Sequence, residues 1–229
     1  MYSLVTRTSE KWVRKSGDTN RLNTDYLFET DNEYGFPVVA SSKNFQAEDL
    51  IPFHLAKGQK KSDIKKAVHF FIDDYKFEQI WSRPHMYIPM LQNYGNMISP
   101  TFSVWSNQPY PLNLFNMYRS RWVTRIFQEV GVNVLVDVRW ADEDTYDFCF
   151  SGIEKNTPVI VNTVGTKLLA NRKLFVDGFY AMMKAIEPSD LFVYGEYMPL
   201  DFEKYFQSVT YFESFWKKQR DKMAERKVI

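Results

Sequence analysis

The chain has 229 residues, of which 45% are hydrophobic and 25% charged, a balance that excludes wholesale disorder and allows one core without disulfide or metal staples. Its formal net charge of +1 excludes a global field that would attract nucleic acid or an anionic membrane, so any such contact has to come from a local patch. The single cysteine, Cys149, excludes an intrachain disulfide, and no run of 18 apolar residues occurs, so we expect a cytoplasmic protein without a membrane partner.

The first part of the chain predicts little regular structure. Residues 1–33 alternate charged, small polar and isolated apolar side chains, which indicates an N-terminal arm. We expect the first strand at 36–42 and then a crossover with short helical turns up to residue 66. The crossover carries the densest basic run of this half, Lys57, Lys60, Lys61, Lys65 and Lys66. Such a run is typical of a solvated face, and phosphate contact is the alternative.

Five further strands are predicted from short apolar runs. The segment "AVHFFID" at 67–73 is too short for an independent helix and too continuously apolar for a half-exposed strand, which is typical of strands buried on both faces in parallel sheets. Similar runs follow at 95–105, 131–140, 157–165 and 190–197. With the strand at 36–42, they make about six.

Helical periodicity occupies the segments between these strands. Apolar residues step by three or four along 111–131, where Gly131 has the place of a C-terminal glycine, and along 170–188, which Pro188 ends. A short helix should end at Gly95. We expect the longest helix over 201–227, so that 201–229 forms a C-terminal amphipathic helix.

The order strand, helix, strand, repeated at roughly 30 residues, predicts a single α/β domain over 1–229, with a mostly parallel sheet and right-handed crossover helices. Two architectures satisfy this order: an incomplete or irregular barrel, which we favour, and an open doubly wound sheet. No G-x-G-x-x-G or Walker loop follows any strand, which argues against dinucleotide and P-loop sites.

Polar side chains end the predicted strands, and in parallel sheets these ends meet at one edge where ligands bind. We therefore predict a polar ligand-binding cleft there. Its candidate binding residues are Asp73, Asp74, Asp137, Arg139, Trp140 and Glu196, and further polar or aromatic residues end the same strands at Thr101, Ser103, Asn162, Thr163 and Tyr194. Taken singly, each carboxylate has a structural alternative, as a turn cap or as the partner of an arginine. Asp74 is better placed than Asp73 to cap the turn that follows, so Asp73 is the first choice for mutation.

Several chemistries fit this set, and no catalytic residue can be assigned. If Asp73, Asp137 and Glu196 share one cleft, their oxygens suit Mg²⁺ or Mn²⁺. Asp137 and Glu196 could instead form a general acid/base pair. The absence of His and Cys residues at metal-ligand spacing argues against zinc. His69 is interpreted as a hydrogen-bonded core residue and Cys149 as a packed strand residue.

The ordered motifs "VHFFIDDYKFEQIW", "ISPTFSVW", "NMYRSRWVTRIFQEVGVNVLVDVRWAD", "YDFCFSGIEKNTPVIVNTVG" and "AIEPSDLFVYGE" resemble the uncharacterised family known as domain of unknown function four-four-one-seven. The resemblance covers about 34–196. It implies a phage, plasmid or other bacterial mobile element as the source and the host cell cytoplasm as the location. It implies no activity. The family pattern has an aspartate where this chain has Thr101, which would leave a carboxylate cluster incomplete.

Three functional hypotheses follow. The first is a cytoplasmic phage or mobile-element accessory protein whose strand-end cleft binds a nucleotide or nucleic acid. The second is a non-enzymatic protein that binds a host or phage protein, or is sensed by a host defence system, which fits the aromatic content of 17%. The third is a metal-dependent hydrolase or nuclease. Whether the protein is an enzyme stays open.

Overall fold

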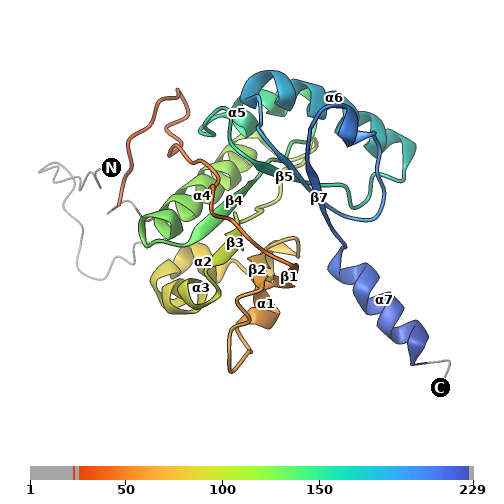
Figure 1. Ribbon diagram of the computed structural model, residues 1–229. Coiled ribbons are helices and arrows are strands. Elements are labelled where there is room, and N and C mark those ends of the chain that lie inside the picture. Colours follow the sequence, from red (N-terminus) through yellow and green to blue (C-terminus); the bar gives the residue numbers. More distant parts are fainter. Residues whose placement is uncertain (1–22, 24–25, 227–229) are drawn as a thin grey trace, which may run out of the picture.

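The computed structural model describes residue 23 and residues 26–226, so most of the predicted arm at 1–33 lies outside the described residues. Seven parallel strands form one sheet, and each pairs with the next along the chain (Figure 1). They are β1 Asp49–Pro52, β2 Lys66–His69, β3 Asn96–Ile98, β4 Asn133–Asp137, β5 Val159–Asn162, β6 Leu191–Tyr194 and β7 Val209–Phe212.

Within the described residues, seven α-helices connect or follow these strands: α1 Phe53–Ala56, α2 Gln79–Ser82, α3 Ile88–Tyr94, α4 Tyr110–Glu129, α5 Tyr146–Phe150, α6 Leu169–Ile186 and α7 Phe215–Glu225. Short 3₁₀ turns occupy Asp74–Lys76, Pro84–Tyr87, Glu143–Thr145 and Phe202–Lys204. The described helices include none with the length and apolarity needed to cross a membrane.

The two faces of the sheet have different cores. Outward-facing strand residues such as Val68 and Val134 pack with helix residues such as Trp122, and Val161 packs with Phe179 of α6 in the same way. On the opposite face, side chains from different strands pack against one another. Its cluster draws on strands from β1 to β7 and contains no helix residue: Phe45, Leu50, Ala67, Phe71, Ile98, Leu135, Ile160, Tyr194 and Phe212.

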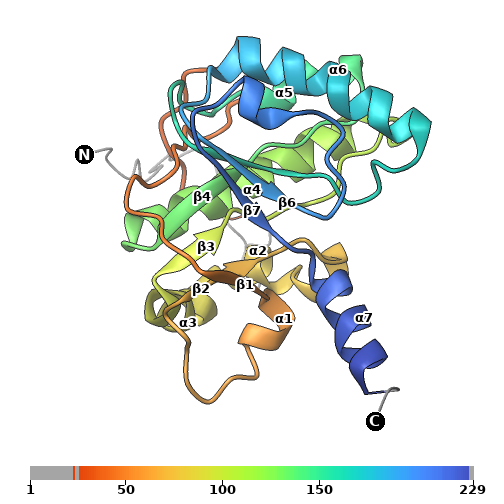
Figure 2. The same ribbon diagram turned by 45° about the vertical axis from the view of Figure 1, so that its right-hand side comes forward.

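Contacts across this inner face show that the sheet is curled. Tyr194 of β6 stacks on Phe71, just after β2, at a ring distance of 4.3 Å, and lies 5.2 Å from the His69 ring. Strands four positions apart in the order therefore meet through their side chains, as in a half-barrel whose helices lie outside (Figure 2). The barrel-like prediction is confirmed, and the doubly wound alternative is wrong because the strand order never reverses.

The long helices and the buried strands match their predictions. α4 and α6 lie within one or two residues of the predicted segments, and Gly131 has a positive φ just after α4. Gly95 likewise caps α3 in the left-handed conformation. The runs predicted at 67–73, 95–105, 131–140, 157–165 and 190–197 contain or overlap β2 to β6.

Three local predictions are wrong. No strand forms at 36–42, where Val39 makes a single isolated bridge to Ile153, and β1 comes instead from the predicted crossover. The expected helix over 201–227 begins only at Phe215, because the preceding residues form a 3₁₀ turn and β7. Cys149 is fully buried as expected, but in helix α5 and not in a strand.

Candidate functional site

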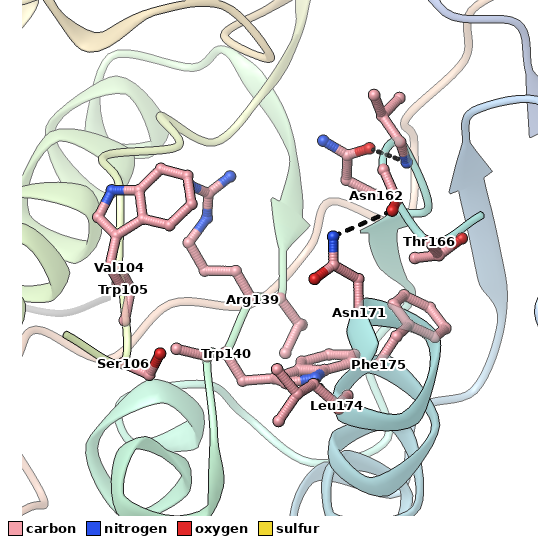
Figure 3. A pocket seen from close by; sticks show the side chains of 14 residues that line it. Val104, Trp105, Ser106, Arg139, Trp140, Asn162, Thr166, Asn171, Leu174 and Phe175 are labelled. Atoms are coloured by element: carbon pink, nitrogen blue, oxygen red, sulfur yellow. Dashed lines mark hydrogen bonds between the residues drawn. The ribbon is translucent and has the colours of Figure 1, made fainter. Parts of the chain in front are cut away.

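A pocket of about 310 Å³ lies where β4 and β5 end, bounded by the loop after β3 and the first turns of α6 (Figure 3). This is the carboxyl edge of the sheet. The residues that line it are Val104, Trp105, Ser106, Val138, Arg139, Trp140, Ala141, Asn162, Val164, Gly165, Thr166, Asn171, Leu174 and Phe175. The volume is at the lower end of the range for small-molecule sites.

Among the described residues that line the pocket, Arg139 is the charged one, and its guanidinium is held by three hydrogen bonds. Nε donates to Asp137 Oδ2 at 2.7 Å, and Nη1 donates to the carbonyls of Thr101 at 2.6 Å and Phe102 at 3.1 Å. These bonds leave Nη2 without a protein acceptor among the described residues. Trp105 lines the same pocket as Arg139 (Figure 3). Arg139 can therefore offer donors to an anionic or carbonyl group in the pocket.

Asp137 is the buried partner of this arginine, with only 2% of its surface exposed. Burial raises the pKa of Asp137, while the positive charges of Arg139 and Arg121 act in the opposite direction. Its Oδ1 has no hydrogen-bond partner in the described structure. A buried carboxylate with one unsatisfied oxygen is costly, so the ion pair with Arg139 has to be kept for the fold to tolerate it.

Aromatic side chains form two sides of the pocket. The Trp140 Nε1 donates to the Leu174 carbonyl at 3.1 Å, and its ring lies 5.3 Å from that of Phe175. The indole packs so closely on α6 that a Cβ added to Gly178 would stand 2.0 Å from Nε1. Trp105 is 59% exposed, and its backbone is bound on both sides by the amide of Asn113.

Two asparagines brace the loop between β5 and α6. Asn162 Oδ1 accepts from the Val164 N–H at 2.8 Å, and Asn171 Nδ2 donates to the Gly165 carbonyl at 3.1 Å. Each of the two amides thus uses one of its polar atoms for a hydrogen bond to this loop. The other end of each is directed toward the cavity (Figure 3). The pocket thus combines one cation, amide donor and acceptor groups, and flat apolar walls.

The structure distributes the six predicted binding residues over several places. Arg139 and Trp140 line the pocket, and Asp137 lies beneath it. Asp73 is exposed and pairs with Lys76 at 2.7 Å. Glu196 accepts a hydrogen bond from Ser214 and lies 4.0 Å from Arg220. That these residues bind a ligand stays a prediction.

Asp74 has a role other than the expected one. Its Oδ2 accepts from the Ser103 N–H and its Oδ1 from the Ser103 hydroxyl, both at 2.9 Å. The N-cap position of the turn Asp74–Lys76 is occupied by Asp73, which makes no side-chain cap. Asp74 therefore ties the segment after β2 to the loop that carries Trp105.

The predicted carboxylates do not converge. Within residues 23 and 26–226, no three His, Cys, Asp or Glu side chains lie close enough together to hold a metal ion. Asp137 is bonded to Arg139, and Glu196 is absent from the pocket lining, so the two are not arranged as an acid/base pair around this cavity. Burial raises the pKa of the Cys149 thiol to about 12, which suits a packed side chain and not a nucleophile.

Some residues that line the pocket are not among the predicted binding residues. Asn162 ends a predicted strand, but it has no charge that would mark it as a candidate binding residue. Trp105, Ser106 and Asn171 lie on a loop and a helix, and their place in the pocket depends on how those segments are tethered. The Asn113 and Asn171 hydrogen bonds that fix them have no local sequence pattern.

Comparison with known proteins gives a consistent assignment. The model of the family described as domain of unknown function (DUF4417) matches residues 28–218. The chain is 31% identical over 222 residues to the Gene 1 protein of Mycobacterium phage L5, with 94% of each chain covered. It is 29% identical over 222 residues to the Gene 1 protein of Mycobacterium phage D29, covering 96% of this chain and 82% of that one. No solved structure is significantly similar.

Proposed function

The chain belongs to the DUF4417 family, and from that premise we propose that it is a phage or mobile-element accessory protein whose strand-end pocket binds a nucleotide. The phage setting is supported by the family and by the two phage relatives. The ligand class comes from the pocket alone.

The observation that carries the proposal is that Asp137 anchors Arg139 in a pocket whose lining also includes the exposed indole of Trp105. Asp137 and two carbonyls use three of its N–H groups, so Nη2 is the part of the guanidinium left for a ligand. Guanidinium groups bind phosphate through paired donors. Because the side chain is already held in place, less conformational entropy is lost when a phosphate binds.

The walls of the pocket suit the other half of a nucleotide. Trp105 and Trp140 present flat faces on which a base can stack, and the amides of Asn162 and Asn171 can read donor and acceptor groups at its edge. The pocket volume of about 310 Å³ favours a mononucleotide over a larger ligand.

Isothermal titration calorimetry with the four ribonucleoside 5′-monophosphates tests the proposal. We expect saturable binding of at least one of them, and a loss of about fivefold or more in affinity for Trp105→Ala, because stacking on an aromatic ring contributes about 1–3 kcal/mol per base. Trp216→Ala is the matched control, since Trp216 is also exposed, at 53%, but lies on α7. Absence of binding by the wild type, or an equal loss in both variants, would contradict the proposal.

A second function is favoured by α7. No side chain of this helix is buried in the described structure, and its Trp216 and Met223 are 53% and 62% exposed. In both views the helix points away from the sheet (Figures 1 and 2). Exposed aromatic and methionine side chains are typical of protein-binding surfaces. Affinity capture from infected cells should then retrieve a protein with the wild type and not with the double variant Trp216→Ala, Met223→Ala.

A further inference from the structure

A second concavity lies on the other half of the molecule and shares no residue with the strand-end pocket. It is an open groove of about 670 Å³ between the connection from α1 to β2 and the segment that leads into α3. Both segments lie together at the lower end of the molecule in Figure 1. Lys57, Lys60 and Lys61 come from the first segment, and Met86, Tyr87 and Asn93 from the second.

The basic run at 57–66 divides into two groups in the structure. Lys65 pairs with Glu48 at 3.1 Å and Lys66 with Asp63 at 3.6 Å, and neither lines the groove. The three lysines that do line it are exposed, and none of them forms an ion pair within the described residues. No Asp or Glu of the described part of the chain lines the groove. Positive charge is therefore gathered there without compensation, in a chain whose net charge is only +1.

The opposite wall of the groove is mostly uncharged. Met86 is 59% exposed, and Tyr87 is held in place by an edge-to-face contact of 5.0 Å with Phe53. The amides of Gln59 and Asn93 add hydrogen-bonding groups. A line of cations facing apolar and amide side chains matches the two parts of an unpaired nucleic-acid strand, its phosphates and its bases.

We infer that this groove binds single-stranded nucleic acid, with the phosphates on Lys57, Lys60 and Lys61 and the bases toward Met86 and Tyr87. A duplex hides its bases and would use only the lysine side. An acidic peptide would satisfy the lysines but leave the apolar wall without a flat partner.

Fluorescence anisotropy with the full chain and a labelled oligothymidylate of about eight nucleotides tests the inference. The double variant Lys60→Glu, Lys61→Glu should bind about tenfold or more weakly at low salt. The double variant Lys184→Glu, Lys222→Glu is the matched control, because it makes the same change in charge at exposed lysines outside the groove. Its affinity should stay within about twofold of the wild type. The wild-type affinity should fall with salt on a log–log slope of about −2, for three contacts on a single strand.

Three results would overturn the inference: equal losses in the two double variants, equal affinity for a duplex of the same length, or competition by polyglutamate as strong as that by unlabelled oligothymidylate. The groove variant should keep the wild-type mononucleotide affinity of the strand-end pocket. That readout separates failure of the groove from failure of the pocket, and it also shows that the variant is folded.

Discussion

Among single residues, the neighbouring aspartates Asp73 and Asp74 make different kinds of contact. The Asp73 side chain is 61% exposed and pairs with Lys76 at the surface. Asp74 accepts two hydrogen bonds from Ser103 and thereby joins two strand-end loops. The sequence alone favoured Asp73 for ligand contact and Asp74 for a local cap. The difference arises because the partner of Asp74 lies 29 residues away and cannot be inferred from neighbouring positions.

Replacing these aspartates should therefore have unequal effects. Asp74→Ala should lower the free energy of unfolding by about 1.5–3 kcal/mol, because it leaves the Ser103 donors without their charged acceptor. Asp73→Ala is the control, and its unfolding midpoint should match that of the wild type because surface ion pairs contribute little. Urea unfolding followed by circular dichroism compares the two. Equal midpoints for both variants would show that the Asp74 tether does not matter.

His69 predicts a pH dependence of stability. It is 1% exposed, and its Nδ1 accepts from the Phe71 N–H at 3.1 Å, as expected for a core histidine. Burial, with the positive charge of Lys218 and the nearby His54, lowers the pKa of His69 from 6.5 to about 3. Between these two pH values the unfolded chain binds a proton that the folded chain does not, so this contribution to stability is present above pH 6.5 and is lost as the pH falls below it.

The measurement is the difference between the wild type and His69→Asn, which keeps a hydrogen-bond acceptor but cannot titrate. From about pH 6 to pH 4 the wild type should lose about 1.4 kcal/mol per pH unit relative to the variant, and above about pH 7 the difference should be constant. Taking the difference removes the titration of groups common to both proteins. Parallel stability curves across this range would show that His69 is not kept neutral by the fold.

At the scale of elements, the contact between α6 and the β4 terminus shapes the pocket. Gly178 is buried on α6 because the Trp140 indole occupies the space where a side chain would be. The indole therefore packs against the helix at Gly178, and its Nε1 donates a hydrogen bond to the Leu174 carbonyl. A residue that weakens the helix intrinsically is thus needed to give the pocket its wall.

Gly178→Ala should destabilise the protein by about 1–3 kcal/mol through overpacking, although alanine is about 1 kcal/mol more favourable than glycine in an ordinary helix. The same substitution in a Trp140→Leu background should be neutral or stabilising, because the obstructing ring is gone. A double-mutant cycle by chemical unfolding measures this reversal of sign. If Gly178→Ala stabilises the wild-type protein, the close contact is not real.

Helix length and the place of a strand in the sheet also determine what the sequence could predict. α4 and α6 have 20 and 18 residues, enough for a helical stripe to stand out, and the runs that contain β2, β4, β5 and β6 are mostly apolar because both faces of the sheet are covered. β1 and β7 form the two edges of the sheet, where polar and exposed positions such as Asp49 and Tyr211 interrupt the apolar pattern. Arg139 and Trp140 could be predicted because they follow the end of a strand. Trp105 could not, because its place in the pocket depends on hydrogen bonds that hold its loop.

At the scale of the whole molecule, the interior of the half-barrel depends on its last strand. Phe212 of β7 is 5% exposed and stacks on Phe192 at a ring distance of 6.3 Å, within the cluster that also contains Tyr194. α7 begins directly after this strand and is attached near its start, where Lys218 pairs with Asp49 of β1 and the Phe215 N–H donates to the Tyr194 hydroxyl. From Arg220 to its end, α7 is exposed.

Two truncations should therefore differ sharply. A chain that ends at Asp221 keeps β7 and the anchored turn of α7, and its thermal unfolding should match that of the full chain. A chain that ends at Ser208 loses Phe212 and uncovers Phe192 and Tyr194, so it should show no cooperative transition. Near-ultraviolet circular dichroism during heating reports on the buried aromatic rings. A cooperative transition in the shorter chain would show that β7 is dispensable.

The sequential strand order has a consequence for how the protein is made. Each strand finds its partner in the strand synthesised just before it, so pairing can follow the growing chain as it leaves the ribosome. No described strand has to wait for a neighbour several units downstream. The concave aromatic layer is different, because Phe212, its last member, lies in β7 and is translated after all the other described strands. Translation can thus build the sheet gradually, while the inner core closes only when the final strand is released.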